Sequence, residues 1–481
     1  MLIPALALAL AAAPVHRYAL VLGSNTGEGV SAAALRYADD DALSMHELLL
    51  EAGVESVLLA TPDADTIRLH PQTKPIAPPT LDALKGAFAA QRASMLRAQE
   101  SGETIEWFFF FSGHGDVDRG EGFLGLERGK LTRKILHDEL LAKIPPTARA
   151  HVILDACRSG ALVGSKGPGG GVRLAMPSAF AADATWSAST GFLLSSSSVK
   201  ESHEYDRYQS GVFSFEVRSA LRGAADANAD GTVTYAELGA FLETANRGID
   251  NPRFRPEFVT LPPKGREGLE VPLLTWPQEE EGRIELTLEE HAYIERANGE
   301  RLLDVHTRTH ATRLHLPSER PLFVRSDDEQ REATVDGTNV ITVLQPKTNA
   351  TAQKGALDRA LTQLFAVAFE PQNVETFTST WQPAELTTFT LPEPPTSAIV
   401  ARHAAGWLTI GAVIASGVSF GIAWQQSGPD DARLDQLARV QRNNTITAAN
   451  TLGVAGLGLA VVTAVTWAIL TLKYDLPVFT F

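Results

Sequence analysis

Cysteine is almost absent from this chain of 481 residues, which contains only Cys157. Intrachain disulfides and zinc sites built from cysteines are therefore excluded, because each needs more than one thiol. Basic residues are also in deficit, since 42 Lys and Arg are set against 57 Asp and Glu and the formal net charge is −15. This balance argues against nucleic acid as a partner, because phosphate binding needs a basic face.

The composition is otherwise that of a globular protein, with 44% hydrophobic and 21% charged residues. This balance excludes a chain that is disordered as a whole. At about 100–200 residues per domain, the length predicts several domains. No period in the sequence indicates internal repeats.

The first residues of the chain are apolar. Residues 1–13 read MLIPALALALAAA and end in small residues, which is typical of a short signal peptide. No Lys or Arg opens this segment, and Pro14 is an unusual residue after a cleavage site. We predict export, and the alternatives are a mis-assigned start, an N-terminal anchor or a buried first element.

The C-terminal part, 398–481, contains two uncharged stretches, 404–424 and 452–472. Each has about the 20 residues that a helix needs to cross a bilayer. Both are rich in small residues and carry Trp near an end, as membrane helices often do. We predict a transmembrane helical hairpin, and the alternative is a buried hairpin of a soluble domain.

Arginines in the connecting segment, 425–444, predict how this hairpin is oriented. Because positively charged loops stay in the cytoplasm, the segment is expected on that side. The large N-terminal region would then lie outside the cytoplasm, in the periplasm, in agreement with an exported N-terminus. Insertion with that region on the cytoplasmic face of the membrane is the alternative.

Residues 14–262 alternate short apolar runs with helical patterns. The apolar runs lack polar alternation, so we predict an α/β fold whose mostly parallel sheet is sandwiched by helices. The expected strands are 18–25, 54–60, 105–112, 150–156 and 191–197, and the expected helices are 32–52, 80–100, 131–144, 212–222 and 234–245.

The pattern changes in residues 263–347, where polar and apolar residues alternate. Strands are expected at 283–288 and 312–317, and the pair Asp336-Gly337 predicts a turn inside 333–344. We predict a small antiparallel β domain here. A linker, 348–397, with one helical piece near 354–368, would lead to the membrane.

Residues that can carry chemistry follow two of the predicted strands. His114 lies between glycines after the strand 105–112, and Cys157 follows the strand 150–156. Ligands of open α/β sheets bind beyond the carboxyl ends of the strands, so we expect both side chains in one crevice. A neighbouring imidazole can convert a thiol into a nucleophilic thiolate, and backbone N–H groups of Gly115 and Cys157 would form an oxyanion hole. The alternative is two separate structural residues.

The segments FFFFSGHGD (108–116) and ILDACRSG (153–160) resemble the His and Cys motifs of the caspase/metacaspase clan, in its bacterial caspase-like branch of C14-like peptidases. The resemblance extends over roughly 17–250. It implies a cysteine endopeptidase with protein or peptide substrates, in which His114 is the general base and Cys157 the nucleophile. The alternative is a catalytically silent caspase-fold module for signalling or assembly, and the intact pair favours the enzyme.

The resemblance also implies a specificity. In metacaspase-like enzymes, an acidic residue two positions before the nucleophile and another in the first helix build a pocket for Arg or Lys. Asp155 and Asp41 match these positions, and carboxylates suit a guanidinium partner. The alternative is that Asp155 caps a turn and that Asp41 belongs to a solvated helix start.

A loop rich in glycine and proline, 165–190, follows the Cys motif. Loops of this length are usually functional or disordered. In this clan activation often involves cleavage of such a loop, and Lys166 and Arg173 would suit self-processing after basic residues. A mobile lid is the alternative.

Residues 226–237 match the twelve-residue EF-hand loop, with Gly231 at its sharp bend. We predict a structural calcium site there, although the dyad chemistry itself requires no cofactor. The alternative is a turn and a capped helix with solvated acidic residues. The expected calcium ligands are Asp226, Asn228, Asp230, Thr232 and Glu237.

Overall fold

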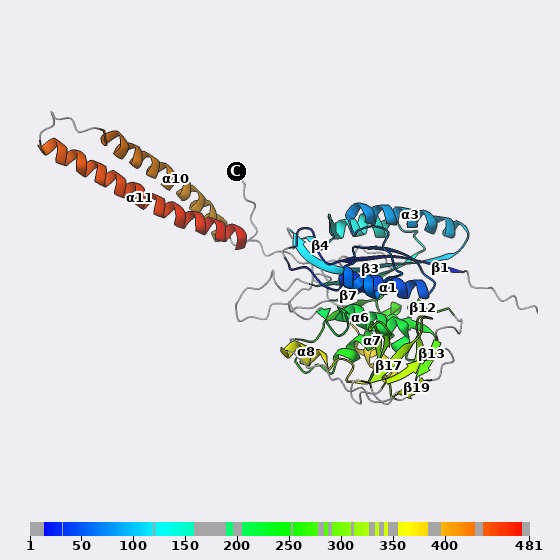
Figure 1. Ribbon diagram of the computed structural model, residues 1–481. Coiled ribbons are helices and arrows are strands. Elements are labelled where there is room, and N and C mark those ends of the chain that lie inside the picture. Colours follow the sequence, from blue (N-terminus) through cyan, green and yellow to red (C-terminus); the bar gives the residue numbers. More distant parts are fainter. Residues whose placement is uncertain are drawn as a thin grey trace, which may run out of the picture. The chain divides into compact units, whose positions relative to one another are not determined.

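The computed structural model forms two units, Met1–Phe389 and Thr390–Phe481, which are described separately (Figure 1). The predicted signal peptide, nearly all of the loop 165–190 and the Asp336-Gly337 turn lie outside the described residues. Those residues are 14–30, 32–118, 121–157, 189–195, 204–251, 254–277, 283–286, 291–308, 312–326, 332–335, 341–344, 355–382, 396–428 and 436–473.

The first unit is built around a mostly parallel sheet, as predicted. Its main strands are β1 (Val15–Ser24), β2 (Glu55–Ala60), β3 (Thr104–Asp118), β6 (Arg149–Cys157), β7 (Thr190–Ser195) and β11 (Phe258–Leu261). They lie in the order β2-β1-β3-β6-β7-β11, and only β11, at one edge, runs antiparallel to its neighbour. The end of β3 pairs antiparallel with β4 (Glu121–Gly125), and β4 pairs antiparallel with β5 (Lys130–Thr132).

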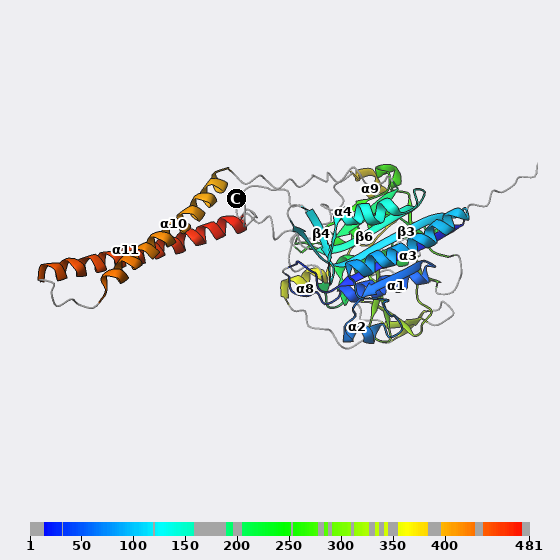
Figure 2. The same ribbon diagram turned by 90° about the horizontal axis from the view of Figure 1, so that it is seen from above.

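Helices cover both faces of this sheet. They are α1 (Ala38–Glu51), α2 (Ala64–Leu69), α3 (Leu81–Glu100), α4 (Arg133–Ile135) with the turns Leu136–Leu140 and Leu141–Lys143, α6 (Val212–Ser219) with the turn Ala220–Ala224, and α7 (Tyr235–Asn246). Figure 1 shows α3 on one side of the sheet and α6 and α7 on the other; Figure 2 shows α3 and α4 from above.

Strand β3 explains why two helical layers are needed. Phe108 and Phe110 are buried in the same cluster as residues of α1, whereas Trp107 and Phe109 are buried with residues of α3. Successive side chains of a strand point to opposite faces, so an unbroken apolar run must be covered on both sides.

The helices form near their predicted ranges, with local departures. The range 32–52 is helical only from Ala38, where the side-chain oxygen of Asn25 accepts the first backbone N–H. The helix expected to end near 222 is broken at Gly223, whose φ is 105°. A Cβ there would lie 2.0 Å from the carbonyl oxygen of Arg313, so glycine is required.

The β domain packs against α6 and the turn Ala220–Ala224 rather than standing alone. Leu303 and Leu314 belong to the same buried cluster as Phe215 of α6. Its five-stranded antiparallel sheet has the order β15-β14-β17-β18-β19, and two further strands pair beside it. The strands are β13 (Arg283–Leu286), β14 (Ala292–Arg296), β15 (Arg301–Val305), β16 (Thr312–His315), β17 (Leu322–Ser326), β18 (Glu332–Val335) and β19 (Ile341–Leu344).

Two short helices follow, α8 (Gly355–Leu361) and α9 (Pro371–Thr380), and the second was not expected from the sequence. The ring of Phe377 packs where Gly239 of α7 leaves room. The indole N–H of Trp381 donates to the carbonyl oxygen of Thr260 in the edge strand β11, at 3.2 Å. The segment after the β domain thus packs back onto α7 and β11 within the first unit.

The second unit is a helical hairpin of α10 (Thr396–Gln426) and α11 (Gln436–Lys473). The two helices contact each other where Thr409 Oγ1 donates to Thr463 Oγ1 at 2.8 Å. Both are long and apolar enough to cross a membrane over Val400–Gln426 and Gln436–Ala468, and only 17% and 11% of their most apolar windows are buried. The ranges agree with the predicted hairpin, while its location in a membrane stays a prediction.

Candidate active site

The ends of β3 and β6 bring the predicted dyad together along the backbone. In the parallel register Ser112 is opposite Asp155, and His114 is opposite Cys157. Neighbouring strands lie about 4.8 Å apart, so the Cα atoms of the last pair are adjacent. The side chain of His114 is buried. Gly115, the other predicted oxyanion donor, follows in β3 opposite Leu124 of β4.

Gly113, which precedes the histidine in β3, occupies a position with no room for a side chain. A Cβ at this position would lie 2.7 Å from Cζ of Phe111 and 2.9 Å from the carbonyl oxygen of Ser24. Both distances are too short for any side chain, so glycine allows β3 to pass close to β1. The glycine in the His motif therefore has a packing reason.

Asp41 lies in the buried part of the predicted specificity pocket. Its carboxylate accepts hydrogen bonds from Ser112 Oγ (3.0 Å), the Gly211 N–H (3.1 Å) and Ser210 Oγ. It also forms an ion pair with Arg218, 3.0 Å from Nη1 to Oδ1, and both side chains are at most 5% exposed. Burial raises the pKa of Asp41, and the charge of Arg218 opposes that rise. The interior of the protein thus already supplies a counter-charge for this carboxylate.

Asp155 lies across the sheet end from Ser112 and is also buried. Its Oδ2 accepts hydrogen bonds from the N–H (3.1 Å) and Oγ (2.6 Å) of Ser214. Burial, together with the charge of Asp41, raises the pKa of Asp155 to about 6. Asp41 and Asp155 are thus close enough to influence one another, as the predicted pocket requires.

A small pocket that is open to solvent lies beside these strand ends. The pocket is lined by residues of α1, β3, β6, the strand β8 (Glu204–Tyr205) and the strand β9 (Ser210–Gly211). Its polar and small lining residues are Asp41, Ser112, Gly113, Asp155, Glu204 and Gly211.

Sequence reasoning missed Arg218, and for Glu204 it gave no role beyond lining the substrate loop. Glu204 Oε1 accepts the backbone N–H groups of Arg36 (2.7 Å) and Tyr37 (2.8 Å), just before α1. Arg218 is a buried cation in helix α6, where Glu216 is the other charged residue. A lone basic residue on the core face of a helix is the signal that could have pointed to a buried acidic partner.

The predicted calcium loop adopts a bent conformation around its acidic residues. Asp226 accepts hydrogen bonds from the N–H groups of Asp230 (3.1 Å) and Gly231 (2.9 Å), and Gly231 has a φ of 83°. Burial, together with the nearby carboxylates, raises the pKa of Glu237 to about 7. Oxygen-rich side chains in one bent loop fit a hard cation such as Ca²⁺.

The same loop has a partner that the sequence did not show. Its strand β10 (Thr232–Thr234) pairs antiparallel with β12 (Pro272–Thr275), and Val233 is buried in the core. The predicted calcium ligands Asn228 and Asp230 are exposed, and Asn228 donates to Asp230 at 3.0 Å. The pairing of β10 with β12 therefore fixes one end of the loop to the rest of the unit.

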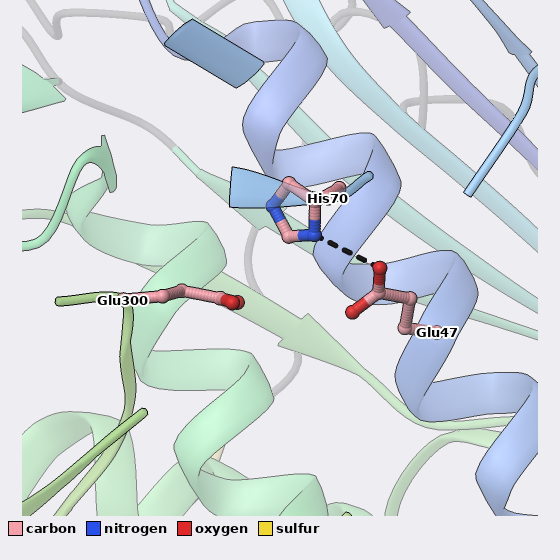
Figure 3. A group of neighbouring side chains, drawn as sticks. All are labelled: Glu47, His70 and Glu300. Carbon is pink, nitrogen blue, oxygen red and sulfur yellow. Dashed lines mark hydrogen bonds and ion pairs between the residues drawn. The ribbon is translucent and has the colours of Figure 1, made fainter. Parts of the chain in front are cut away.

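A second polar group joins α1 to the β domain (Figure 3). His70 Nδ1 and Glu47 Oε1 are 2.9 Å apart, and Glu300 completes a set whose donor atoms lie within 4.8 Å of one another. Arg296 contacts both carboxylates, Glu47 at 3.1 Å and Glu300 at 2.7 Å.

The charges of this second group compensate one another. Burial alone would lower the pKa of His70, but its hydrogen bond to Glu47 and the charge of Glu300 raise it. Burial alone would raise the pKa of Glu47, but His70 and Arg296 lower it to about 2. Because Arg296 forms ion pairs with both carboxylates and His70 is hydrogen-bonded to one of them, we assign the group a structural role at this contact.

Residues 16–255 match the family model of the caspase domain. No curated protein matches the chain. Among 63 chains of solved structures that match, one titled "structure of pro-sf-caspase-1" has 12% sequence identity. That match covers 51% of this chain and 90% of the other, with a TM-score of 0.32, and at this score it carries no argument.

Proposed function

The chain belongs to the caspase-domain family, and from this premise we propose that it is a cysteine endopeptidase with a His114/Cys157 dyad. The observation that carries the proposal is the register of β3 and β6, in which these two residues are paired at the carboxyl ends of parallel strands. Substrates of open α/β sheets bind at such ends. The substrates are proteins or peptides.

In the proposed reaction His114 takes the thiol proton of Cys157, and the thiolate attacks the carbonyl carbon of the scissile peptide bond. The N–H groups of Gly115 and Cys157 hold the negative oxygen of the tetrahedral intermediate. When the C–N bond breaks, His114 returns the proton to the leaving amine. Water, deprotonated by the same imidazole, then hydrolyses the thioester and regenerates the thiol.

We further propose that cleavage follows Arg or Lys. The pocket beside the strand ends contains the carboxylates of Asp41 and Asp155, which supports a cationic P1 side chain. A carboxylate in a partly dry pocket replaces the water that a guanidinium must lose there. An aspartate at P1 would meet like charges and be rejected.

The proposal extends to the other parts of the chain. The hairpin of α10 and α11 anchors the protein in a membrane, in agreement with its length and exposed apolar residues. The loop 226–237 binds calcium as a structural ion that takes no part in peptide cleavage.

The test of the dyad uses the full chain in detergent and peptides with a fluorogenic group after Arg, Lys or Asp. Cys157→Ala should abolish both hydrolysis and labelling by a thiol-directed probe, because the chain has no other thiol. His114→Ala should abolish hydrolysis too, whereas His137→Ala, which removes an imidazole outside the strand ends, should leave it unchanged.

Hydrolysis that survives in Cys157→Ala would contradict the dyad. A wild-type protein that cleaves none of the peptides would instead favour a catalytically silent caspase-fold module. Equal cleavage after Asp and Arg would leave the dyad in place but refute the acidic pocket.

A further inference from the structure

The pocket beside the dyad contains three carboxylates, and they are not equivalent. Asp41 is paired with Arg218 and accepts hydrogen bonds from neighbouring donors at its buried end. Arg218 also donates to Ser210 Oγ at 3.1 Å. For Asp41 to bind a cationic ligand, this buried ion pair would have to be shared or broken, which is costly.

Glu204, in β8, lines the same pocket as the residues of the strand ends. Its Oε1 is held by the N–H groups of Arg36 and Tyr37, so the carboxylate is fixed in position. The guanidinium of Arg36 forms an ion pair with Asp206 and not with Glu204; its Nη1 lies 2.8 Å from Oδ1 of Asp206. Among the residues that the structure describes, Glu204 has no ion-pair partner.

The electrostatic balance of the pocket therefore favours an incoming cation. Burial raises the pKa of Glu204, and the charge of Asp41 adds to that rise. Burial likewise raises the pKa of Asp155 to about 6. An ionised Glu204, which has no ion-pair partner among the described residues, gains stability from a positive charge placed beside it in the pocket.

We propose that Glu204 is a specificity-determining residue of this pocket: together with Asp155 it binds the cationic P1 side chain, while Asp41 is a positioning residue. The inference rests on the proposed peptidase function and names the residues that select its substrate. Asp41 fixes Ser112 and Gly211, two other lining residues, and it already forms a buried ion pair with Arg218.

The experiment compares two fluorogenic peptides that differ only at P1, one with arginine and one with its neutral isostere citrulline. The readout is the ratio of their kcat/KM values, measured on the full chain in detergent. Glu204→Gln keeps an oxygen to accept from Arg36 and Tyr37 but removes the charge, so the ratio should fall roughly tenfold or more. Glu204→Asp keeps the charge with a shorter reach and should give an intermediate ratio.

Two variants serve as controls. Asp206→Asn removes a negative charge two residues away on the same loop, where the side chain is 75% exposed and pairs with Arg36. Its ratio should change less than about twofold, because exposed charges are screened. Asp41→Asn should lower the melting temperature and reduce both kcat/KM values alike, because it leaves Arg218 buried without its partner.

The outcomes separate this inference from the proposed function. A wild-type protein without hydrolysis would overturn the function. Preference for arginine that survives unchanged in Glu204→Gln, or that disappears in Asp41→Asn alone, would overturn the role of Glu204 and leave the peptidase intact. If Glu204→Gln lowers the melting temperature but leaves the arginine-to-citrulline ratio unchanged, Glu204 only caps the start of α1 and does not select the substrate.

Discussion

At the scale of single residues, burial makes the pocket sensitive to pH. Asp155 has a pKa of about 6, raised chiefly by burial. A carboxyl group binds a cation only when ionised, and ionisation at this pKa is completed between about pH 5 and pH 7. The strength of cation binding should therefore change within the physiological range.

The first prediction concerns this titration. The arginine-to-citrulline ratio of kcat/KM should rise about tenfold from pH 5 to pH 7, because Asp155 gains its charge over that interval. Titration of the dyad affects both substrates and cancels in the ratio. Asp155→Asn should give a low, flat profile, and a flat profile in the wild-type protein would refute the assignment.

The same residues show how far the sequence predicts the site. Asp41 and Asp155 could be named because they stand at recognisable positions next to a helix start and a nucleophile motif. The partners of Arg218 and Glu204 could not be predicted, because they are distant in the sequence: 177 residues separate Arg218 from Asp41, and 168 separate Glu204 from Arg36. Contacts of this kind exist only after the chain has folded.

At the scale of elements, the loop 226–237 has both the residue pattern of a calcium loop and a backbone bent by its own acidic side chains. Asp226 and Glu237 lie at its two ends, and Glu237 accepts the N–H of Ala227 at 3.2 Å. The loop is thus closed on itself by acidic side chains. Calcium would replace several of these internal hydrogen bonds with direct oxygen ligation.

The second prediction is that calcium raises the melting temperature of the full chain and that its binding at pH 7 releases protons. The release is expected because burial raises the pKa of Glu237 to about 7 and a ligand must be ionised. Titration calorimetry in buffers of different ionisation enthalpy measures it. Glu237→Gln should abolish both effects.

Glu243→Gln provides the matched control for this experiment. Glu243 lies on the same helix, α7, but its side chain is 51% exposed and pairs with Arg247. Calcium should stabilise this variant as it does the wild-type protein. Equal stabilisation of Glu237→Gln would exclude the loop as the calcium site.

The elements that sequence reasoning found share one property, a strong local pattern. The apolar runs of β3 and β6 and the periodic helix α3 were recognised from such patterns. The strands β14 and β17 were missed because their apolar residues alternate over only five positions. Their pairing depends on each other and on the face of α6, which local periodicity does not encode.

At the scale of the whole molecule, the number of membrane crossings constrains the topology. If α10 and α11 both span the bilayer, the segments before and after the hairpin lie on the same side. Arg439 and Arg442 lie near the start of α11, within the connecting segment 425–444, and favour the cytoplasm for that segment. The first unit and Phe481 are then both outside the cytoplasm.

The third prediction tests this arrangement with a reporter enzyme that is active only in the cytoplasm. Fused after Phe481 it should be silent, and inserted after Ser427, between the helices, it should be active. Arg439→Glu combined with Arg442→Glu removes the orienting charge and should weaken this contrast, whereas Arg359→Glu, on α8 of the first unit, should not. An active fusion at Phe481 and a silent one at Ser427 would place the peptidase unit in the cytoplasm, because two crossings keep both flanks of the hairpin on one side. A reporter active at both positions would mean that the hairpin does not span the membrane at all.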